Sequence, residues 1–283
     1  MDELTPIGQL SFVAIDLEAA GMLPGGQPIT EIGAARFSVQ RDGTVCPGPT
    51  MQTLVRPDRP IPPRITELTG IDDALVERAP HLDEVWPGFL DFLSAEESTV
   101  LLAHNARSDL GLLDTAARKL GLPWEGPVTL CTALMARETW PEAPRHGLEA
   151  LLDWRQSHRK DAQHHRALPD ALHTRTLFSL IVAEIKPRDL GVLLELGRSE
   201  APEEADHVDA PERLEGLSEA VTHQRKVLLS YRGGSKGKGH RPVTPLGFFR
   251  QAGVIYLHAW CHLDEMAKVF RADRIRSFAE EAG

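Results

Sequence analysis

The sequence predicts an α/β protein with two domains: a mixed sheet flanked by helices, followed by a small all-β domain. Two observations support this prediction. Three strand-like segments near the N-terminus are followed by alternating helical and strand-like segments, which is typical of a sheet that carries helices on its faces. Residues 213–283 contain short β-branched or aromatic runs separated by glycine-rich turns, which favours a small barrel.

The first three segments, at residues 10–17, 29–39 and 51–55, are separated by turns rich in glycine and proline. We therefore expect three strands with short antiparallel connections. Helical periodicity over residues 82–93 and an apolar run at residues 99–104 then predict a helix and a buried strand.

Composition and charge indicate how the chain is divided. With 283 residues, 42% hydrophobic and 25% charged, it is an ordinary globular chain of one or two domains. The net charge is −10, yet residues 213–283 hold 12 basic against 7 acidic residues. The acidic segment at residues 198–212, RSEAPEEADHVDAPE, is poor in apolar residues, as a linker is. We therefore expect domains at residues 1–197 and 213–283.

The N-terminal segment MDELTPIGQL lacks the basic and apolar regions of a secretory signal, and no apolar run reaches the roughly 18 residues that a membrane span needs. We therefore expect a cytoplasmic protein that does not act in a membrane. The three cysteines, Cys46, Cys131 and Cys261, are scattered and form no CxxC pair. This spacing favours reduced thiols over a disulfide framework or a thiolate zinc site.

The segment FVAIDLEAAG carries the first candidate site residues. Because side chains alternate along a strand, Asp16 and Glu18 share one face, and Val13, Ile15 and Leu17 lie on the other. Two acids on an otherwise apolar strand can hold a cation. They can equally be solvated acids on an exposed face.

The segment LLAHNARSDLGLL carries the second set. Asn105 is a candidate helix N-cap, and Asp109 would then lie in or just after the first turn. The spacing to Leu112 and Leu113 places Asp109 on the apolar face of this helix, where a lone acid is costly unless it is paired. Compensation of the helix dipole is the alternative explanation.

The third segment is QHHRALPDALH. Pro169 suits the first turn of a helix that runs to about residue 184, which places Asp170 at its start and His165 in the preceding loop. If the four acids of the three segments converge, they need a cation, and an all-oxygen set favours Mg²⁺ or Mn²⁺ over Zn²⁺. The zinc alternative would require His164 and His165 as joint ligands. We expect His164 and His173 to be solvent-facing neighbours.

In order and spacing, the three segments resemble the exonuclease motifs of the DEDDh family, which includes RNase T and the proofreading subunit of bacterial DNA polymerase III. The matching residues are Asp16-x-Glu18, His104-Asn105-Ala106-x-x-Asp109 and His165-x-Ala167-x-x-Asp170. The segment ITELTGI, which contains Thr69 and Gly70, also resembles the family's loop beside the terminal nucleotide of the substrate.

This resemblance implies a ribonuclease H-like fold over about residues 8–185. It also implies that Asp16, Glu18 and Asp170 coordinate two divalent ions, Mg²⁺ or Mn²⁺, that Asp109 supports the second ion directly or through water, and that His165 acts as general base. Two such ions can serve both the attacking and the leaving oxygen of a phosphodiester.

The family further implies stepwise release of nucleoside 5′-monophosphates from the 3′ end of single-stranded DNA or RNA. Recognition would depend on the backbone more than on base edges. From the motifs, the candidate nucleic-acid contacts in the first domain are Thr69, Gly70, His104 and Asn105.

The runs KVLLSY, RPVTPLGFF, VIYLHAW and KVFRADRI resemble a WYL domain from about residue 217 to 278, with Tyr256 in its signature strand. This resemblance implies an SH3-like β-barrel of a class that often binds nucleic acid or another anionic ligand. Arg241, Arg271 and Arg274 are the candidate anion contacts, and each of them can equally be a surface or ion-paired residue. Tyr256 is either a core residue or a stacking platform.

The sequence thus predicts a metal-dependent 3′→5′ exonuclease, with DNA favoured over RNA, coupled to a domain that binds nucleic acid or regulates. We expect a role in DNA repair or in removing single-stranded ends, with a homodimer or a replication or repair protein as partner. The alternative function is an oligonucleotide-sensing regulator whose exonuclease-like domain is an inactive scaffold.

Overall fold

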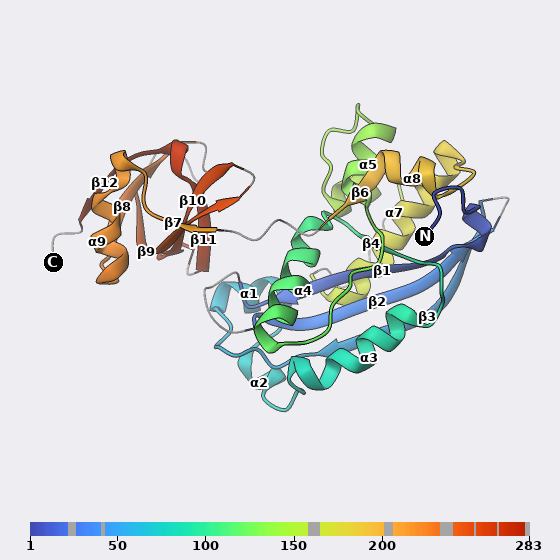
Figure 1. Ribbon diagram of the computed structural model, residues 1–283, viewed down its shortest axis with the longest axis horizontal. Helices are drawn as coiled ribbons and strands as arrows, with labels where there is room; N and C mark the ends of the chain where they lie inside the picture. The colour runs from blue at the N-terminus through green and yellow to red at the C-terminus, as the bar shows by residue number, and fades with distance from the viewer. Residues whose placement is uncertain are drawn as a thin grey trace. The chain divides into compact units, whose positions relative to one another are not determined.

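The computed structural model describes residues 1–21, 27–40, 43–157, 165–200, 206–232, 240–251, 253–264 and 266–280. The chain forms two compact units (Figure 1), of which the first holds most of residues 1–201 and the second most of residues 202–283. None of the helices in these ranges has both the length and the apolar character that a membrane span requires.

The first unit is built on one mixed sheet. Its strands are β1 (Ser11–Ala19), β2 (Ile29–Val39), β3 (Val45–Leu54), β4 (Thr99–Ala103), β5 (Thr129–Cys131) and β6 (Arg198–Ser199). Their spatial order is β3-β2-β1-β4-β5-β6, with β1 antiparallel to β2 and parallel to β4. This topology confirms the predicted mixed sheet, and it places β1 at the centre of the unit.

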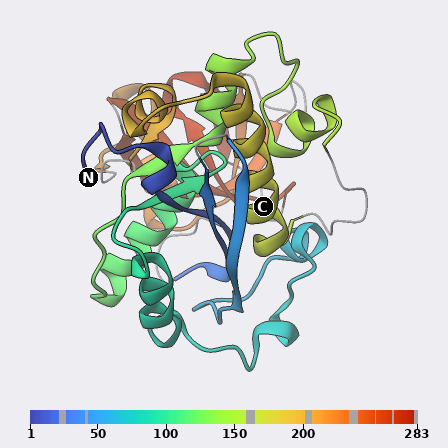
Figure 2. The same ribbon diagram turned by 90° about the vertical axis from the view of Figure 1, so that its right-hand side faces the viewer.

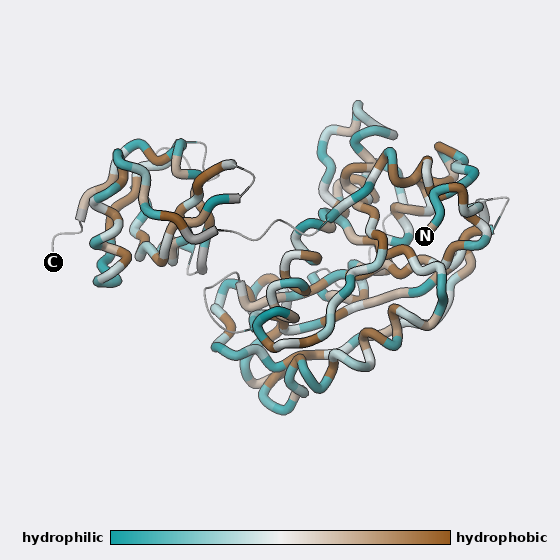
Figure 3. Tube along the Cα trace, viewed as in Figure 1, coloured by the Kyte–Doolittle hydropathy of each residue, from teal (hydrophilic) through white to brown (hydrophobic). Residues whose placement is uncertain are grey.

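Helices connect the strands. The segments are η1 (Ile7–Gln9), α1 (Pro63–Thr69), α2 (Asp73–Val76), α3 (Leu82–Ser94), α4 (Arg107–Leu120), α5 (Thr132–Thr139), α6 (Leu148–Trp154), α7 (Ala167–Ile185) and α8 (Leu190–Gly197). Hydrophobic and hydrophilic residues alternate along the turns of α3 (Figure 3), which is the pattern of a helix with one face on a core.

Two apolar cores cover the two faces of this sheet. Phe12 of β1 packs against Phe178 of α7, with ring centroids 5.0 Å apart, whereas Val13 belongs to the opposite core with Trp86 of α3. Figure 2 shows helices on both sides of the strands. Full burial of each such side chain contributes about 1.5–3 kcal/mol to the free energy of unfolding. The two cores therefore hold β1, and the residues at its end, in a fixed position.

The second unit is an antiparallel sheet with one packed helix. Its elements are β7 (Asp206–Val208), η2 (Glu212–Leu214), α9 (Gly216–Thr222), β8 (Val227–Tyr231), β9 (His240–Gln251), β10 (Val254–Cys261), β11 (Met266–Arg271), η3 (Ala272–Arg274) and β12 (Ile275–Glu280). Five strands follow the order β11-β10-β9-β8-β12, and β7 pairs with β9. This confirms the predicted separate β-structure in the C-terminal region, to which α9 adds one helix.

The segment predicted as a linker is not wholly irregular. At its start, β6 pairs with β5 of the first sheet, and further along β7 pairs with β9 of the second sheet. Backbone hydrogen bonding extends each sheet into a segment whose acidic, proline-rich composition suggests no strand.

Candidate metal centre

The end of β1 carries two carboxylates on one face. Asp16 and Glu18 continue the row of Phe12 and Ala14, as the strand period predicts. The parallel pairing of β1 with β4 extends only to Ala14, whereas the pairing with β2 continues to Ala19. Both acids therefore lie beyond the last pairing of β1 with β4.

Helix α4 brings a third carboxylate to this strand end. Asp109 lies in the first turn of α4 and is buried, and its carboxylate accepts a hydrogen bond from the backbone N–H of Leu17. The predicted cap is wrong, however. The N-cap residue is Ala106, without a side-chain cap, while Asn105 is exposed and has a left-handed backbone with φ of 65°. The chain leaves β4 through a tight turn, and asparagine tolerates this conformation better than most residues do.

Helix α7 brings the fourth carboxylate. It begins at Ala167, with Pro169 and Asp170 in its first turn, as the sequence predicts. His165 lies just before the helix, is exposed, and has a left-handed backbone with φ of 55°. His164 lies outside the described residues.

Three of these carboxylates converge. One oxygen each from Asp16, Glu18 and Asp170 lies within 4.8 Å of the other two. In the part of the chain that the structure describes, this is the one group of three or more His, Cys, Asp or Glu side chains that could hold a metal ion. The fourth acid, Asp109, interacts electrostatically with Asp16.

The electrostatics show that negative charge prevails in this group, although the Arg166 guanidinium acts on Glu18. Burial raises the pKa of Asp16 well above its ordinary value, and the charges of Asp109 and Asp170 raise it further. Burial, with Asp170 and Glu31, raises the pKa of Glu18 to about 8, and burial raises the pKa of Asp109 to about 7. Without a cation, these groups tend to keep their protons near neutral pH.

The donor set fits divalent ions of the hard class. All the converging atoms are carboxylate oxygens, which Mg²⁺ and Mn²⁺ prefer. No ion pair to Asp16 or Glu18 is found among the described residues. No cationic side chain in these residues therefore takes the place of a metal ion at the two carboxylates. Asp16, Glu18 and Asp170 would hold the ions, with Asp109 beside them.

One histidine differs from the prediction. His173 is buried, and its Nδ1 lies 3.4 Å from Oδ1 of Asp170, so it is not a solvent-facing neighbour. The i,i+3 spacing on α7 places both side chains on the same side of the helix. His173 therefore supports the carboxylate of Asp170 from within the protein.

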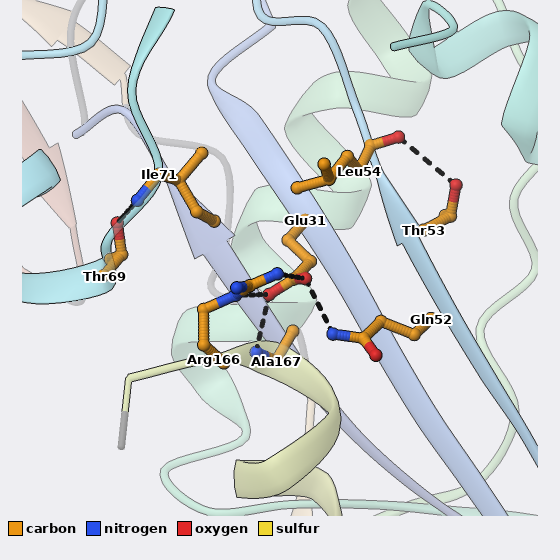
Figure 4. A network of polar contacts seen from close by, with 8 residues as sticks. All are labelled: Glu31, Gln52, Thr53, Leu54, Thr69, Ile71, Arg166 and Ala167. Carbon is orange, nitrogen blue, oxygen red and sulfur yellow. Dashed lines mark hydrogen bonds and ion pairs between the residues drawn. The ribbon is translucent and has the colours of Figure 1, made fainter. Parts of the chain in front are cut away.

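Two further charged residues adjoin the centre, and the sequence motifs do not reveal them. Glu31 on β2 forms an ion pair with Arg166, the residue between His165 and Ala167 (Figure 4). Burial raises the pKa of Glu31, but hydrogen bonds from Arg166, Ala167 and Gln52 lower it below its ordinary value overall. The available signal was a charged residue in the middle of an apolar strand, together with an arginine beside the motif histidine.

The predicted nucleic-acid contacts of the first domain differ in their surroundings. Thr69 is buried and its Oγ1 accepts from the N–H of Ile71, while Gly70 has a φ of 70°. The ring of His104 is held by the Thr132 hydroxyl and the His146 carbonyl oxygen, at 3.0 and 2.9 Å. Burial lowers the pKa of His104 to about 4, so the ring is neutral at neutral pH.

Two of the three predicted anion contacts of the second unit form ion pairs within the protein. Arg241 is buried, with its Nη1 3.0 Å from Asp264, and Arg271 forms a forked pair with Asp273. Arg274 is exposed.

Tyr256 is half-buried and stacks on Phe249 at 5.3 Å. A role in ligand binding stays a prediction for all four residues.

The mixed sheet and the acidic centre define a class of protein that comparison with known proteins identifies. Residues 13–178 match the model of the RNase T exonuclease family, and residues 212–280 match the WYL domain. The chain therefore belongs to the DEDDh exonuclease family and carries a C-terminal WYL domain.

The chain is 35% identical over 246 residues to a Mycobacterium tuberculosis protein named as a bifunctional exonuclease/endonuclease, covering 83% of this chain and 35% of that protein. It is also 35% identical over 187 residues to a DNA polymerase III subunit epsilon-like protein of Rhodobacter capsulatus, covering 66% of this chain and 26% of that protein. The chain thus spans about a third of the length of the first relative and about a quarter of the length of the second.

A solved structure has the same fold. It is the nuclease domain of 3′hExo, described as a DEDDh family member bound to rAMP, with a TM-score of 0.52 and 18% identity over 61% of this chain and 91% of that one.

Proposed function

We propose that this protein is a 3′→5′ exonuclease that removes nucleotides from single-stranded 3′ ends with the help of two divalent ions, Mg²⁺ or Mn²⁺. The observation that carries the proposal is the convergence of Asp16, Glu18 and Asp170 without a paired cation in the described part of the chain. The relationship to a DNA polymerase III subunit epsilon-like protein favours DNA over RNA and a role in DNA repair.

The residues divide the work. The bound ions would neutralise charge on the phosphate and stabilise the attacking and leaving oxygens. Asp16, Glu18 and Asp170 hold them, and Asp109 ties the start of α4 to the backbone of β1. His165 is exposed and takes the proton of the attacking water as a general base.

The proposal assigns the nuclease to residues 1–197 and the WYL domain to residues 213–283, with a linker between them. The WYL domain would bind nucleic acid or regulate the nuclease through the arginines named above. A basic charge balance in this part of the chain supports an anionic ligand.

The test is a parallel assay of 3′-labelled and 5′-labelled DNA and RNA oligonucleotides with Mg²⁺ or Mn²⁺. We expect stepwise loss from the 3′ end, with release of nucleoside 5′-monophosphates and faster cleavage of DNA. Asp170→Ala should abolish cleavage, and His165→Ala should lose about 10²–10⁴-fold in kcat while it keeps metal binding. Tight oligonucleotide binding without metal-dependent turnover would instead support a regulator with an inactive scaffold.

A further inference from the structure

Strand β2 presents two residues directly beside the metal ligands. In the β1–β2 ladder, Gly33 is opposite Asp16 and Glu31 is opposite Glu18. Because Glu31 and Gly33 are two residues apart, they lie on the same face of the sheet. This face of β2 is therefore continuous with the acidic end of β1.

Gly33 allows α7 to approach the backbone of β2. A Cβ atom at this position would lie 2.1 Å from the carbonyl carbon of Ala167 and 2.2 Å from the nitrogen of Leu168. Real Cβ atoms do not approach backbone this closely, so only glycine fits. The first turn of α7, which carries Asp170, thus rests directly on β2.

Glu31 fastens the same turn with its side chain (Figure 4). The carboxylate is fully buried and accepts from Arg166 at Nε (2.9 Å) and Nη2 (2.5 Å), and from the backbone N–H of Ala167 (2.9 Å). Gln52 of β3 donates to it at 2.9 Å. With four donors on its two oxygens, Glu31 is occupied as a structural anion, and its forked contact fixes both the position and the direction of Arg166.

We propose that Glu31 and Arg166 are positioning residues, whose ion pair sets the start of α7 so that Asp170 meets Asp16 and Glu18 and His165 is correctly presented. The ion pair joins the residue that follows His165 to the strand that flanks β1. The expected effect on kcat rests on the proposed exonuclease function. The expected effect on metal binding depends only on how the ion pair places Asp170 beside Asp16 and Glu18.

The rest of α7 does not depend on this ion pair. Farther along the helix, Leu177, Phe178 and Ile181 are buried in the core beneath the sheet, and they hold the helix in place. Loss of the ion pair should therefore loosen only the first turn. A displacement of about 1 Å at reacting groups is enough to cost about 10²-fold in rate.

The test compares Glu31→Gln, Arg166→Gln, Arg166→Lys and the double variant Glu31→Gln/Arg166→Gln with wild type. Glu184→Gln is the matched control, because it removes an ion pair with Arg155 (3.4 Å) at the other end of the same helix. The measurements are kcat and KM on a single-stranded oligonucleotide, Mn²⁺ affinity from the electron paramagnetic resonance signal of free Mn²⁺, and Tm.

We expect each single variant of the ion pair to lower kcat and Mn²⁺ affinity by about 10- to 100-fold, the usual cost of losing a group that supports metal ligands, with little change in KM. Arg166→Lys should not rescue either quantity, because lysine keeps the charge but lacks the planar fork. Glu184→Gln should match wild type in all three measurements.

The double variant separates positioning from stability. It leaves no unpaired buried charge, so its Tm should exceed that of Arg166→Gln, while its kcat stays as low as that of either single variant. The inference is overturned if kcat and Mn²⁺ affinity stay at wild-type values in the single variants, if lysine restores them, or if kcat recovers together with Tm.

Failure of the proposed function gives a different pattern. If wild type cleaves no oligonucleotide, the exonuclease proposal fails, and Mn²⁺ affinity still tests the ion pair. Weaker Mn²⁺ binding by the Glu31 and Arg166 variants than by wild type and Glu184→Gln would then support positioning, and equal binding would overturn it. A wild-type protein that binds no Mn²⁺ overturns both proposals.

Discussion

Both units bury carboxylates, but they treat them in opposite ways. In the second unit, Asp264 is fully buried and has Arg241 Nη1 at 3.0 Å and Lys268 Nζ at 2.6 Å. In the first unit, Asp16 and Glu18 have no ion pair within the described residues, and the charges that act on them are mainly those of other acids, with Arg166 as the cation that acts on Glu18. A buried acid with cationic partners is part of the framework, whereas a converging group without an ion pair is a candidate for binding a cation.

Glu31 shows that the hydrogen-bond and ion-pair partners of a buried acid, and not its place in the sheet, decide whether its pKa is raised or lowered. It lies opposite Glu18 in the ladder, yet its pKa is lowered whereas that of Glu18 is raised to about 8. Glu31 receives four hydrogen-bond donors. The same sheet thus holds one structural acid and two acids of the candidate metal centre next to one another.

The largest expected effect comes from Asp16→Asn. We expect a loss of more than about 100-fold in kcat, since even groups that only support metal ligands cost about 10–100-fold when removed. In EDTA near neutral pH, its Tm should rise above that of wild type, because wild type must take up a proton at this site when it folds and asparagine need not. Oligonucleotide cleavage and thermal unfolding measure the two quantities. A lower Tm in EDTA would mean that Asp16 is a structural acid like Asp264.

The second prediction is the reverse pattern for Asp264→Asn. Breaking a buried pair leaves Arg241 and Lys268 without their carboxylate, and such losses cost about 3–5 kcal/mol. Hydrogen exchange of the amides in β10, followed by mass spectrometry, should become faster, while kcat on a short oligonucleotide stays unchanged. Unchanged exchange in β10 would show that this buried pair contributes nothing to the second unit.

The third prediction concerns the close contact between α7 and Gly33 of β2, which brings Asp170 to the acids of β1. Gly33→Ala should cost about 1–3 kcal/mol, as overpacking does, and should weaken Mn²⁺ binding. Gly88→Ala is the control, because a Cβ at this position in α3 meets nothing within 4 Å, and alanine favours a helix by up to about 1 kcal/mol. Urea unfolding and Mn²⁺ titration measure both. Equal stability of the two variants would show that α7 can shift without penalty.

The sequence predicts those parts of the site that depend on local geometry. The strand period places Asp16 and Glu18 on one face, and the starts of α4 and α7 place Asp109 and Asp170. The ion pair between Glu31 and Arg166 joins residues 135 positions apart, which no local pattern reveals.

The wrong expectations have local causes that the sequence did not expose. Asn105 adopts a left-handed turn instead of capping α4, and His173 turns toward Asp170 instead of solvent. For Arg241 in the second unit, the sequence left an anion contact and an ion pair equally open. The ion pair with Asp264 depends on strand register and on the turn after β10, and a role of Arg241 in ligand binding stays a prediction.

The smallest expected effect is a pH dependence of the metal-free protein. The folded-state pKa of Glu18 is about 8, above its ordinary value of 4.5, so the folded chain binds this proton more tightly than the unfolded chain does. The contribution of Glu18 to the free energy of unfolding is therefore complete below about pH 4.5 and is lost as the pH rises toward 8. His104, with its pKa lowered to about 4, acts in the opposite direction, but only up to its ordinary value of 6.5.

The useful window is therefore about pH 6.5 to 8, in which Glu31, with its lowered pKa, stays ionised and contributes no slope. In EDTA the Tm should fall across this window, and saturating Mn²⁺ should remove the fall, since the ion binds the deprotonated carboxylates. Glu18→Gln should reduce the fall in EDTA, and Asp16 and Asp109, whose pKa values are also raised, should account for the rest of it. A wild-type Tm that stays constant in EDTA would mean that the protein itself neutralises these acids, and the contrast with Asp264 would then be lost.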